Sequence, residues 1–98
     1  MIRIYIEEFV IKYGLKNGIV LTELCKGVFN LHEKILTNND CIKFLQFLTF
    51  KQIRIALEEL VNKNCIIKET KHEGFKRESK YYINEEIYDV FLKEIFYQ

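Results

Sequence analysis

The chain lacks proline, contains only four glycines among its 98 residues and has no low-complexity tract. These absences argue against a disordered or linker-rich chain, and the length predicts one domain, residues 1–98. No apolar run reaches the roughly 18–20 residues that a membrane-spanning helix requires. Acidic Glu7 and Glu8 stand where a secretory signal needs an apolar stretch, so we expect a cytoplasmic protein.

Ligands for a metal ion are scarce. The three cysteines, Cys25, Cys41 and Cys65, form no Cys-x-x-Cys pair, and His32 with Cys25 would supply only two ligands. We therefore expect no metal site and interpret the cysteines as buried thiols. An intermolecular disulfide is the alternative, which a reducing cytosol disfavours.

Catalytic groups are equally few. The single serine is Ser79, and His32 and His72 are the two histidines. No nucleophile has a base and an acid in a supportive context, and Gly14 and Gly18 fit no glycine-rich phosphate-binding pattern. The sequence therefore predicts no enzyme, no cofactor and no small-molecule substrate.

An excess of one charge is also missing, because the formal net charge is +1. The charges are instead separated along the chain. Residues 63–80 hold six bases against three acids, a net of +3, whereas residues 84–98 hold one base against four acids, a net of −3. The first segment can approach phosphate groups, and the second should avoid them.

The first third of the chain predicts two helices separated by a short strand. Apolar side chains recur at helical spacing over residues 2–13, and Gly14 is a suitable helix stop. Residues 16–18 favour a turn and residues 19–21 a strand. Thr22 is a good N-cap for the second helix. That helix would place three apolar side chains inward: Leu24, Val28 and Leu31.

Turn and capping residues divide the middle of the chain. Residues 37–40 predict a break, and residues 41–48 suit a short apolar helix. Thr49 and Gln52 have capping-box spacing, which predicts a helix over residues 50–63. The buried stripe of this helix should consist of Ile53, Ala56, Leu57, Leu60 and Val61.

The last third predicts a β-hairpin and a helix. Asn64 suits a left-handed helix end, and β-prone residues 65–71 and 76–83 flank a polar tip at residues 72–75. Asn84 is a good N-cap for the final helix. Strand alternation should bury two residues of the hairpin, Tyr81 and Ile83.

This order of elements, and two local runs, resemble the winged helix-turn-helix family of bacteria and archaea. The runs are LVNKNCIIKE at residues 60–69 and YYINEE at residues 81–86, on either side of the polar hairpin tip. The resemblance covers residues 49–87 and, loosely, residues 2–31. It implies an α+β fold of helix, short strand, helix, helix, β-hairpin wing and helix.

Two features depart from the family pattern. Family members usually carry glycine where Asn64 stands, and asparagine is an acceptable left-handed substitute. Residues 30–48 are longer than a usual helix–turn–helix connection, which leaves open which segment is the positioning helix.

The resemblance implies binding to double-stranded DNA through recognition helix 50–63 and basic wing 65–83. Arg54 can read guanine and Gln52 adenine, each by paired hydrogen bonds. A solvated helix face is the alternative, and Glu58 strengthens it, as does the neighbouring Glu59. The full set of candidate DNA-binding residues is Lys51, Gln52, Arg54, Lys68, Lys71, His72, Lys76, Arg77 and Lys80.

Two biological settings fit this interpretation. The protein is either a transcription regulator or an accessory factor of a plasmid or mobile element at an origin or operator. The chain resembles accessory proteins of the relaxosome, which act in plasmid conjugation. The resemblance lies in its small size, its excess of Ile, Lys, Asn and Phe, and its order of elements. The alternative function is a winged-helix module that binds protein and not DNA.

The final helix also predicts a homodimer. Its apolar residues span more than the arc of about 100° that one core needs. A second copy could cover the remainder, whereas the alternative is that the first helix and residues 41–48 cover it within one chain. The apolar residues concerned are Ile87, Val90, Phe91, Leu92, Ile95 and Phe96.

Overall fold

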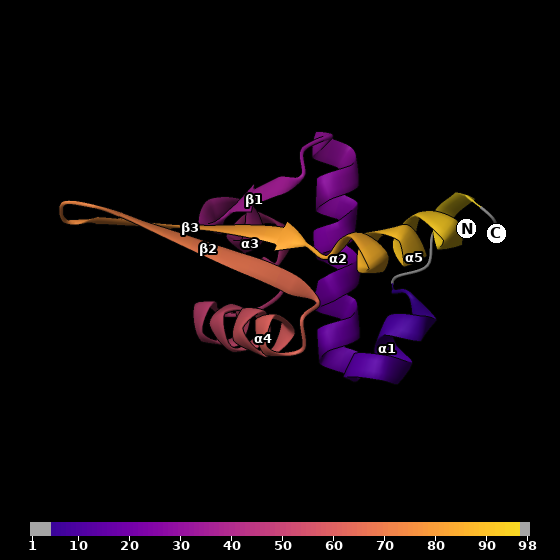
Figure 1. Cartoon of the computed structure of the whole chain (residues 1–98). Coiled ribbons are helices and arrows are strands. Elements are labelled where there is room, and N and C mark those ends of the chain that lie inside the picture. Colours follow the sequence, from indigo (N-terminus) through magenta and orange to yellow (C-terminus); the bar gives the residue numbers. More distant parts are fainter. Residues whose placement is uncertain (1–4, 97–98) are drawn as a thin grey trace.

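A computed structural model describes residues 5–96 and shows an α+β arrangement in which helices gather at one end of a three-stranded antiparallel sheet (Figure 1). The strands lie in the order β1-β3-β2, so the first strand pairs with the second strand of the hairpin. In chain order the elements are α1 (Glu7–Tyr13), α2 (Leu15–Leu31), β1 (Ile35–Thr37), α3 (Asn38–Phe44), α4 (Phe50–Asn62), β2 (Ile66–Glu73), β3 (Lys76–Ile83) and α5 (Glu85–Phe96).

Helix α2 is the element on which the others pack. It contacts α1, α3, α4 and α5, and in Figure 1 it stands across the end of the sheet from which the hairpin projects. Its inward side chains are almost fully covered, which accounts for much of the apolar burial that stabilises the fold. The core residues of α2 are Val20, Leu21, Leu24, Cys25 and Val28.

The turn predicted at residues 16–18 and the strand predicted at residues 19–21 are wrong, because α2 begins at Leu15. Gly14, with φ 94°, ends α1 as expected and turns the chain directly into α2. Gly18 does not form a turn, but a glycine is needed there because α1 packs closely against α2 at this position. A Cβ atom there would lie 2.6 Å from Val10 Cγ2, so the absence of a side chain allows the two helices to approach.

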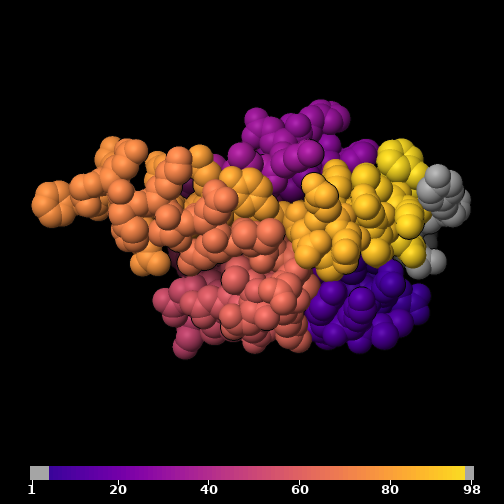
Figure 2. All heavy atoms as spheres, viewed as in Figure 1, coloured from indigo at the N-terminus to yellow at the C-terminus, as the bar shows by residue number. Residues whose placement is uncertain are grey.

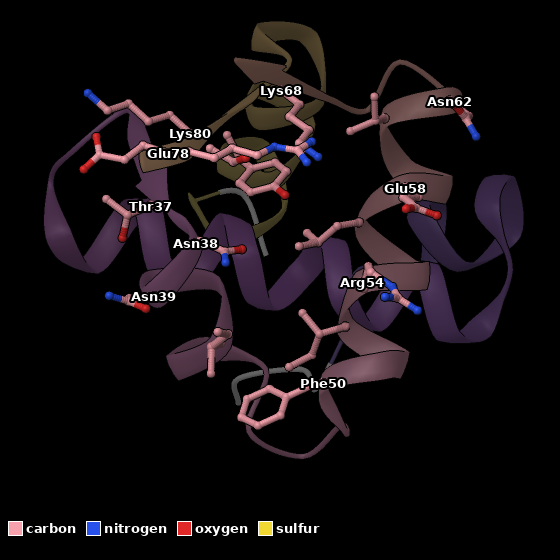
Figure 3. A pocket seen from close by; sticks show the side chains of 17 residues that line it. Thr37, Asn38, Asn39, Phe50, Arg54, Glu58, Asn62, Lys68, Glu78 and Lys80 are labelled. Carbon is pink, nitrogen blue, oxygen red and sulfur yellow. The ribbon is translucent and has the colours of Figure 1, made fainter. Parts of the chain in front are cut away.

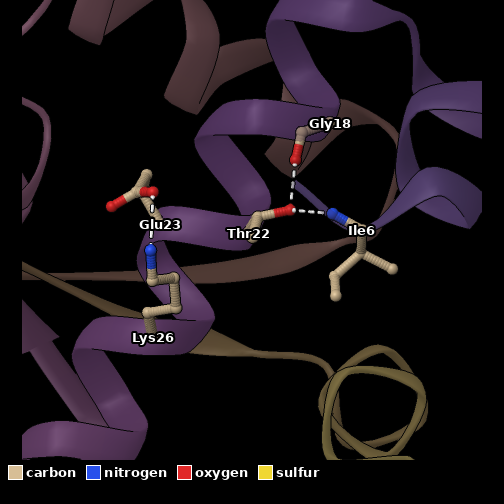
Figure 4. A network of polar contacts seen from close by, with 5 residues as sticks. All are labelled: Ile6, Gly18, Thr22, Glu23 and Lys26. Carbon is tan, nitrogen blue, oxygen red and sulfur yellow. Dashed lines mark hydrogen bonds and ion pairs between the residues drawn. The ribbon is translucent and has the colours of Figure 1, made fainter. Parts of the chain in front are cut away.

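Thr22 is not an N-cap but lies in the middle of α2 (Figure 4). Its hydroxyl donates a hydrogen bond to the Gly18 carbonyl, at 2.8 Å, and accepts one from the backbone amide of Ile6, at 2.9 Å. The side chain therefore satisfies an amide at the start of α1, which has no side-chain cap of its own. Thr22 therefore lies within α2 but provides its capping hydrogen bond to the start of α1.

The other predictions for the first helices hold in part. Helix α1 begins only at Glu7, and residues 2–4 of the predicted helix lie outside the described residues. Leu24 and Val28 are buried as expected, but Leu31 is 40% exposed because α2 ends there. His32 follows in the left-handed conformation.

The segment 30–48 contains the short strand and a helix that begins earlier than predicted. The strand β1 lies at Ile35–Thr37, after α2 instead of before it. Thr37 then forms a capping box with Asp40, so α3 starts at residue 38 and ends at residue 44. The capping box thus starts and ends this helix earlier in the chain than the predicted range, residues 41–48.

The second half of the chain folds largely as predicted. The capping box of Thr49 and Gln52 is present, and the expected stripe of α4 is buried, with Val61 half-buried. Asn64 has φ 60°, and the Asn84 side chain accepts from the Glu86 amide as an N-cap. Tyr81 is buried as expected and Ile83 is half-buried.

The three cysteines are free thiols in the core, which confirms their interpretation as buried residues. Burial raises the pKa of Cys41 to about 12 and also raises the pKa values of Cys25 and Cys65. Without access to solvent, they are poorly placed to form an intermolecular disulfide.

We predict that Gly18→Ala lowers the free energy of unfolding by about 1–3 kcal/mol, because the added methyl group meets the backbone of Val10 and cannot rotate away. This loss should outweigh the gain of about 1 kcal/mol in helix propensity. Urea denaturation followed by circular dichroism measures it. Lys16→Ala, at an exposed position near the start of α2, is the matched control. Equal stability of the two variants would contradict the close approach of α1 and α2.

Candidate nucleic-acid interface

The hairpin of β2 and β3, residues 66–83, projects far from the helices (Figures 1 and 2). Strand β1 pairs with β3 only at residues 80–82. Residues 70–79 therefore form a two-stranded ribbon that β1 does not support. The molecule measures 47 Å along its longest axis against 25 Å and 22 Å along the others.

One face of the hairpin carries basic residues and no acidic residue. Tyr81 is buried on this face, which looks toward α4. The register places Lys68 opposite Tyr81, and His72 opposite Arg77. Because side chains alternate along a strand, all residues of this face can be assigned from the register. We call it the inner face, consisting of Lys68, Thr70, His72, Arg77, Ser79 and Tyr81.

The opposite face, which we call the outer face, is electrically balanced. Each of its bases stands opposite an acid in the register: Lys80 opposite Glu69, Lys71 opposite Glu78, and Lys76 opposite Glu73. Cross-strand pairs of opposite charge are mildly stabilising and cancel each other's field. Glu69 also accepts a hydrogen bond of 3.0 Å from the Tyr82 hydroxyl, which raises the pKa of Tyr82. The six predicted hairpin residues are thus divided equally between the two faces.

A groove of about 1160 Å³ separates the inner face from α4 and from the start of α3 (Figure 3). Arg54 and Glu58 lie one turn apart on α4, with Lys68 across the groove. Lys80 and Glu78 border the groove beside Thr37. The lining therefore includes four bases and two acids and is positive. The four bases are Arg54, Lys68, Arg77 and Lys80.

The three predicted residues of α4 are exposed but have different surroundings. Arg54 lines the groove, and Lys51 lies at the start of the helix outside it. The side-chain carbonyl oxygen of Gln52 accepts a hydrogen bond of 3.0 Å from the backbone amide of Thr49. Paired recognition of adenine needs this same oxygen, so the helix cap competes with the role predicted for Gln52.

Glu58 and Glu59, the two carboxylates of α4 that favour a solvated helix face over DNA binding, are not equivalent. Glu59 accepts a hydrogen bond of 2.8 Å from the side-chain amide of Asn17, near the start of α2. It is therefore occupied within the protein, and Glu58 is the only acid of α4 that lines the groove. This difference was not visible in the sequence, because Asn17 is 42 residues away.

Phe50 is a groove residue that the sequence analysis did not identify. It occupies the first position of α4, lines the groove and is 75% exposed. Its sequence signal was available, since the capping box places it at the helix start and it lies off the buried stripe. Asn38 and Asn39, in the first turn of α3, line the same groove and were also missed.

Other kinds of site find little support in residues 5–96. In this range no three His, Cys, Asp or Glu side chains come together as metal ligands. No helix in the same range combines the length and apolar character that crossing a bilayer demands. Comparisons with protein-family models, curated proteins and solved structures find no match.

We predict that Glu59→Ala lowers the free energy of unfolding by about 1–3 kcal/mol, because it leaves the buried Asn17 amide without its acceptor. Glu58→Ala, which removes the same side chain one residue away, should change stability by less than about 0.5 kcal/mol. Chemical denaturation of both variants makes the comparison. Two equal losses would show that the Asn17 contact does not stabilise the fold.

Proposed function

We propose that the protein is a winged helix-turn-helix protein that binds double-stranded DNA. In this proposal α4 is the recognition helix, α3 the positioning helix and the β2–β3 hairpin the wing. The observation that carries it is the positive groove between α4 and the inner face of the hairpin. The strand order β1-β3-β2 and the succession α2, β1, α3, α4, β2, β3 are compatible with the family that the sequence resembles.

The chemistry of the groove suggests a division of roles. The first turns of α4 enter the major groove, where Arg54 can donate paired hydrogen bonds to guanine. Phe50 offers an exposed apolar surface to a thymine methyl group. Lys68 and Arg77 contact phosphates across the groove, and Lys51 contacts them beside the helix. Acidic α5 lies at the opposite end of the molecule from the hairpin tip, away from the DNA (Figure 1).

The same arrangement fits a regulator or an accessory factor of a plasmid or other mobile element, acting in the cytoplasm without catalysis or a cofactor. Both roles need only a protein that recognises a DNA site and holds it.

A homodimer through α5 extends the proposal. Phe91 is buried against Phe29 of α2, and Phe96 also contacts Phe29, at a ring separation of 6.1 Å. Within one chain, α2 thus supplies part of the cover of α5. Ile95 remains 37% and Phe96 66% exposed, and a second copy can cover them. A twofold axis at this end would direct two hairpins toward one DNA duplex.

The alternative is a winged-helix module that binds protein without DNA, which the small net charge and the balanced outer face favour. Salt dependence separates the two. Fluorescence anisotropy with a labelled, 30-base-pair A/T-rich duplex should show an affinity that falls at least about tenfold between 50 and 200 mM salt. Failure to bind at tens of micromolar, or binding that salt leaves unchanged, would contradict the DNA proposal.

We predict that the inner face carries more of the affinity than the outer face. Lys68→Ala/Arg77→Ala should weaken duplex binding at least tenfold and reduce the salt slope by about 2, since two phosphate contacts are lost. The matched variant Lys71→Ala/Lys76→Ala removes the same charge from outer-face positions that do not line the groove, and should weaken binding less than about threefold. Equal effects of the two variants would show that the register of the hairpin does not direct DNA binding.

We predict that Phe50 contacts thymine methyl groups. Replacing every thymine of the duplex by uracil removes these methyl groups and should weaken binding by the natural chain severalfold. Phe50→Ala should bind both duplexes with the same reduced affinity. If the natural chain and the variant discriminate equally between the two duplexes, Phe50 does not read the methyl group.

A further inference from the structure

The tip of the hairpin holds an aromatic side chain that nothing in its surroundings covers. Gly74 and Phe75 form a two-residue turn between the last paired residues, Glu73 and Lys76. Gly74 has φ 59°, and Phe75 does not have a positive φ. This matches a type II′ turn, which needs glycine at its first position and nothing particular at its second. The turn therefore does not explain Phe75, whose exposure is 111%.

The ribbon can carry Phe75 well beyond the helices. Four residue pairs, from Thr70–Ser79 to Glu73–Lys76, extend past the last residue that β1 supports. At about 3.4 Å per residue they span roughly 10 Å between the first and last pair. The minor groove of DNA is about 7.5 Å deep, so the tip can reach its floor while α4 remains in the adjacent major groove.

The charge of the hairpin residues next to the tip indicates which groove of DNA the tip enters. Arg77 and His72 face each other one pair before the final pair of the ribbon, on the acid-free inner face. Narrow A/T-rich minor grooves have an enhanced negative potential that attracts a cation such as the Arg77 guanidinium. The next pair, Glu73 and Lys76, is balanced and does not oppose entry.

We propose that Phe75 is a wedge that enters an A/T-rich minor groove, partly unstacks one base step and bends the duplex. This inference rests on the proposed DNA binding. Apolar side chains inserted in this way kink DNA by about 20–90°, at a cost of a few kcal/mol for the unstacked step. The ring then stacks on the opened base, and flexible TA steps yield most easily.

Resonance energy transfer between dyes at the ends of a 30-base-pair A/T-rich duplex with central TA steps measures the bend. Binding of the natural chain should shorten the distance between the ends by an amount that corresponds to a bend of about 20–90°. Phe75→Ala should lose most of this bend and bind at least fivefold more weakly. Phe75→Leu keeps an apolar wedge and should retain the bend. Phe47→Ala removes another exposed aromatic ring, 56% exposed and outside the groove lining, and should behave like the natural chain.

Two outcomes would overturn the wedge. In the first, the natural chain binds the duplex without bending it; in the second, Phe75→Ala bends the duplex as strongly as the natural chain does. If the first outcome is accompanied by binding to phosphatidylserine vesicles that Phe75→Ala abolishes, the tip is a membrane contact instead. If the natural chain binds no duplex at all, the proposed function fails together with the wedge, and this is seen before any substitution is tested.

Discussion

Two hydrogen bonds from Asn84 fix the register of the hairpin at its base. The Asn84 amide donates to the Cys65 carbonyl at 3.0 Å, and its side chain donates to the Asn64 carbonyl at 3.1 Å. Asn64 can present that carbonyl because it adopts the left-handed conformation at the end of α4. Ile66 and Tyr81 are then buried, whereas Ile67 stays 54% exposed. A slip by one residue would move every side chain to the other face.

The charge distribution of the candidate interface depends on this register. It brings Lys68 and Arg77 to the face that looks toward α4, and it sets each outer lysine opposite a glutamate. Of the net charge of +3 over residues 63–80, the two positive charges of Lys68 and Arg77 thereby lie on one face of the hairpin, and the third belongs to Lys63 at the end of α4. A protein with a total charge of only +1 can thus present a local positive surface.

The position of α4 depends on a second set of contacts, centred on α2. Asn17 of α2 binds Glu59 of α4, and Gly18 allows α1 to lie close against the same end of α2. The capping box of Thr49 and Gln52 then fixes the first turn of α4, where Phe50 is presented. Near the helices the groove is thus bordered by elements that these contacts hold in place, and beyond them by a ribbon that β1 does not support.

Local signals predicted the second half of the chain well, because capping boxes, left-handed asparagines and a hairpin are decided by residues within a few positions. The first half was harder. Gly18 and Thr22 resemble turn and cap residues, but their partners Val10 and Ile6 lie on another helix. The division of the hairpin charges also escaped prediction, since it requires the register, which the sequence analysis did not assign.

Lysine acetylation followed by mass spectrometry tests most directly which face of the hairpin meets DNA. Lys68 and Lys71 are both exposed on β2 and lie on opposite faces. The account predicts that a saturating A/T-rich duplex slows acetylation of Lys68 at least fivefold and that of Lys71 less than twofold. Protection of Lys71 with Lys68 still reactive would contradict it.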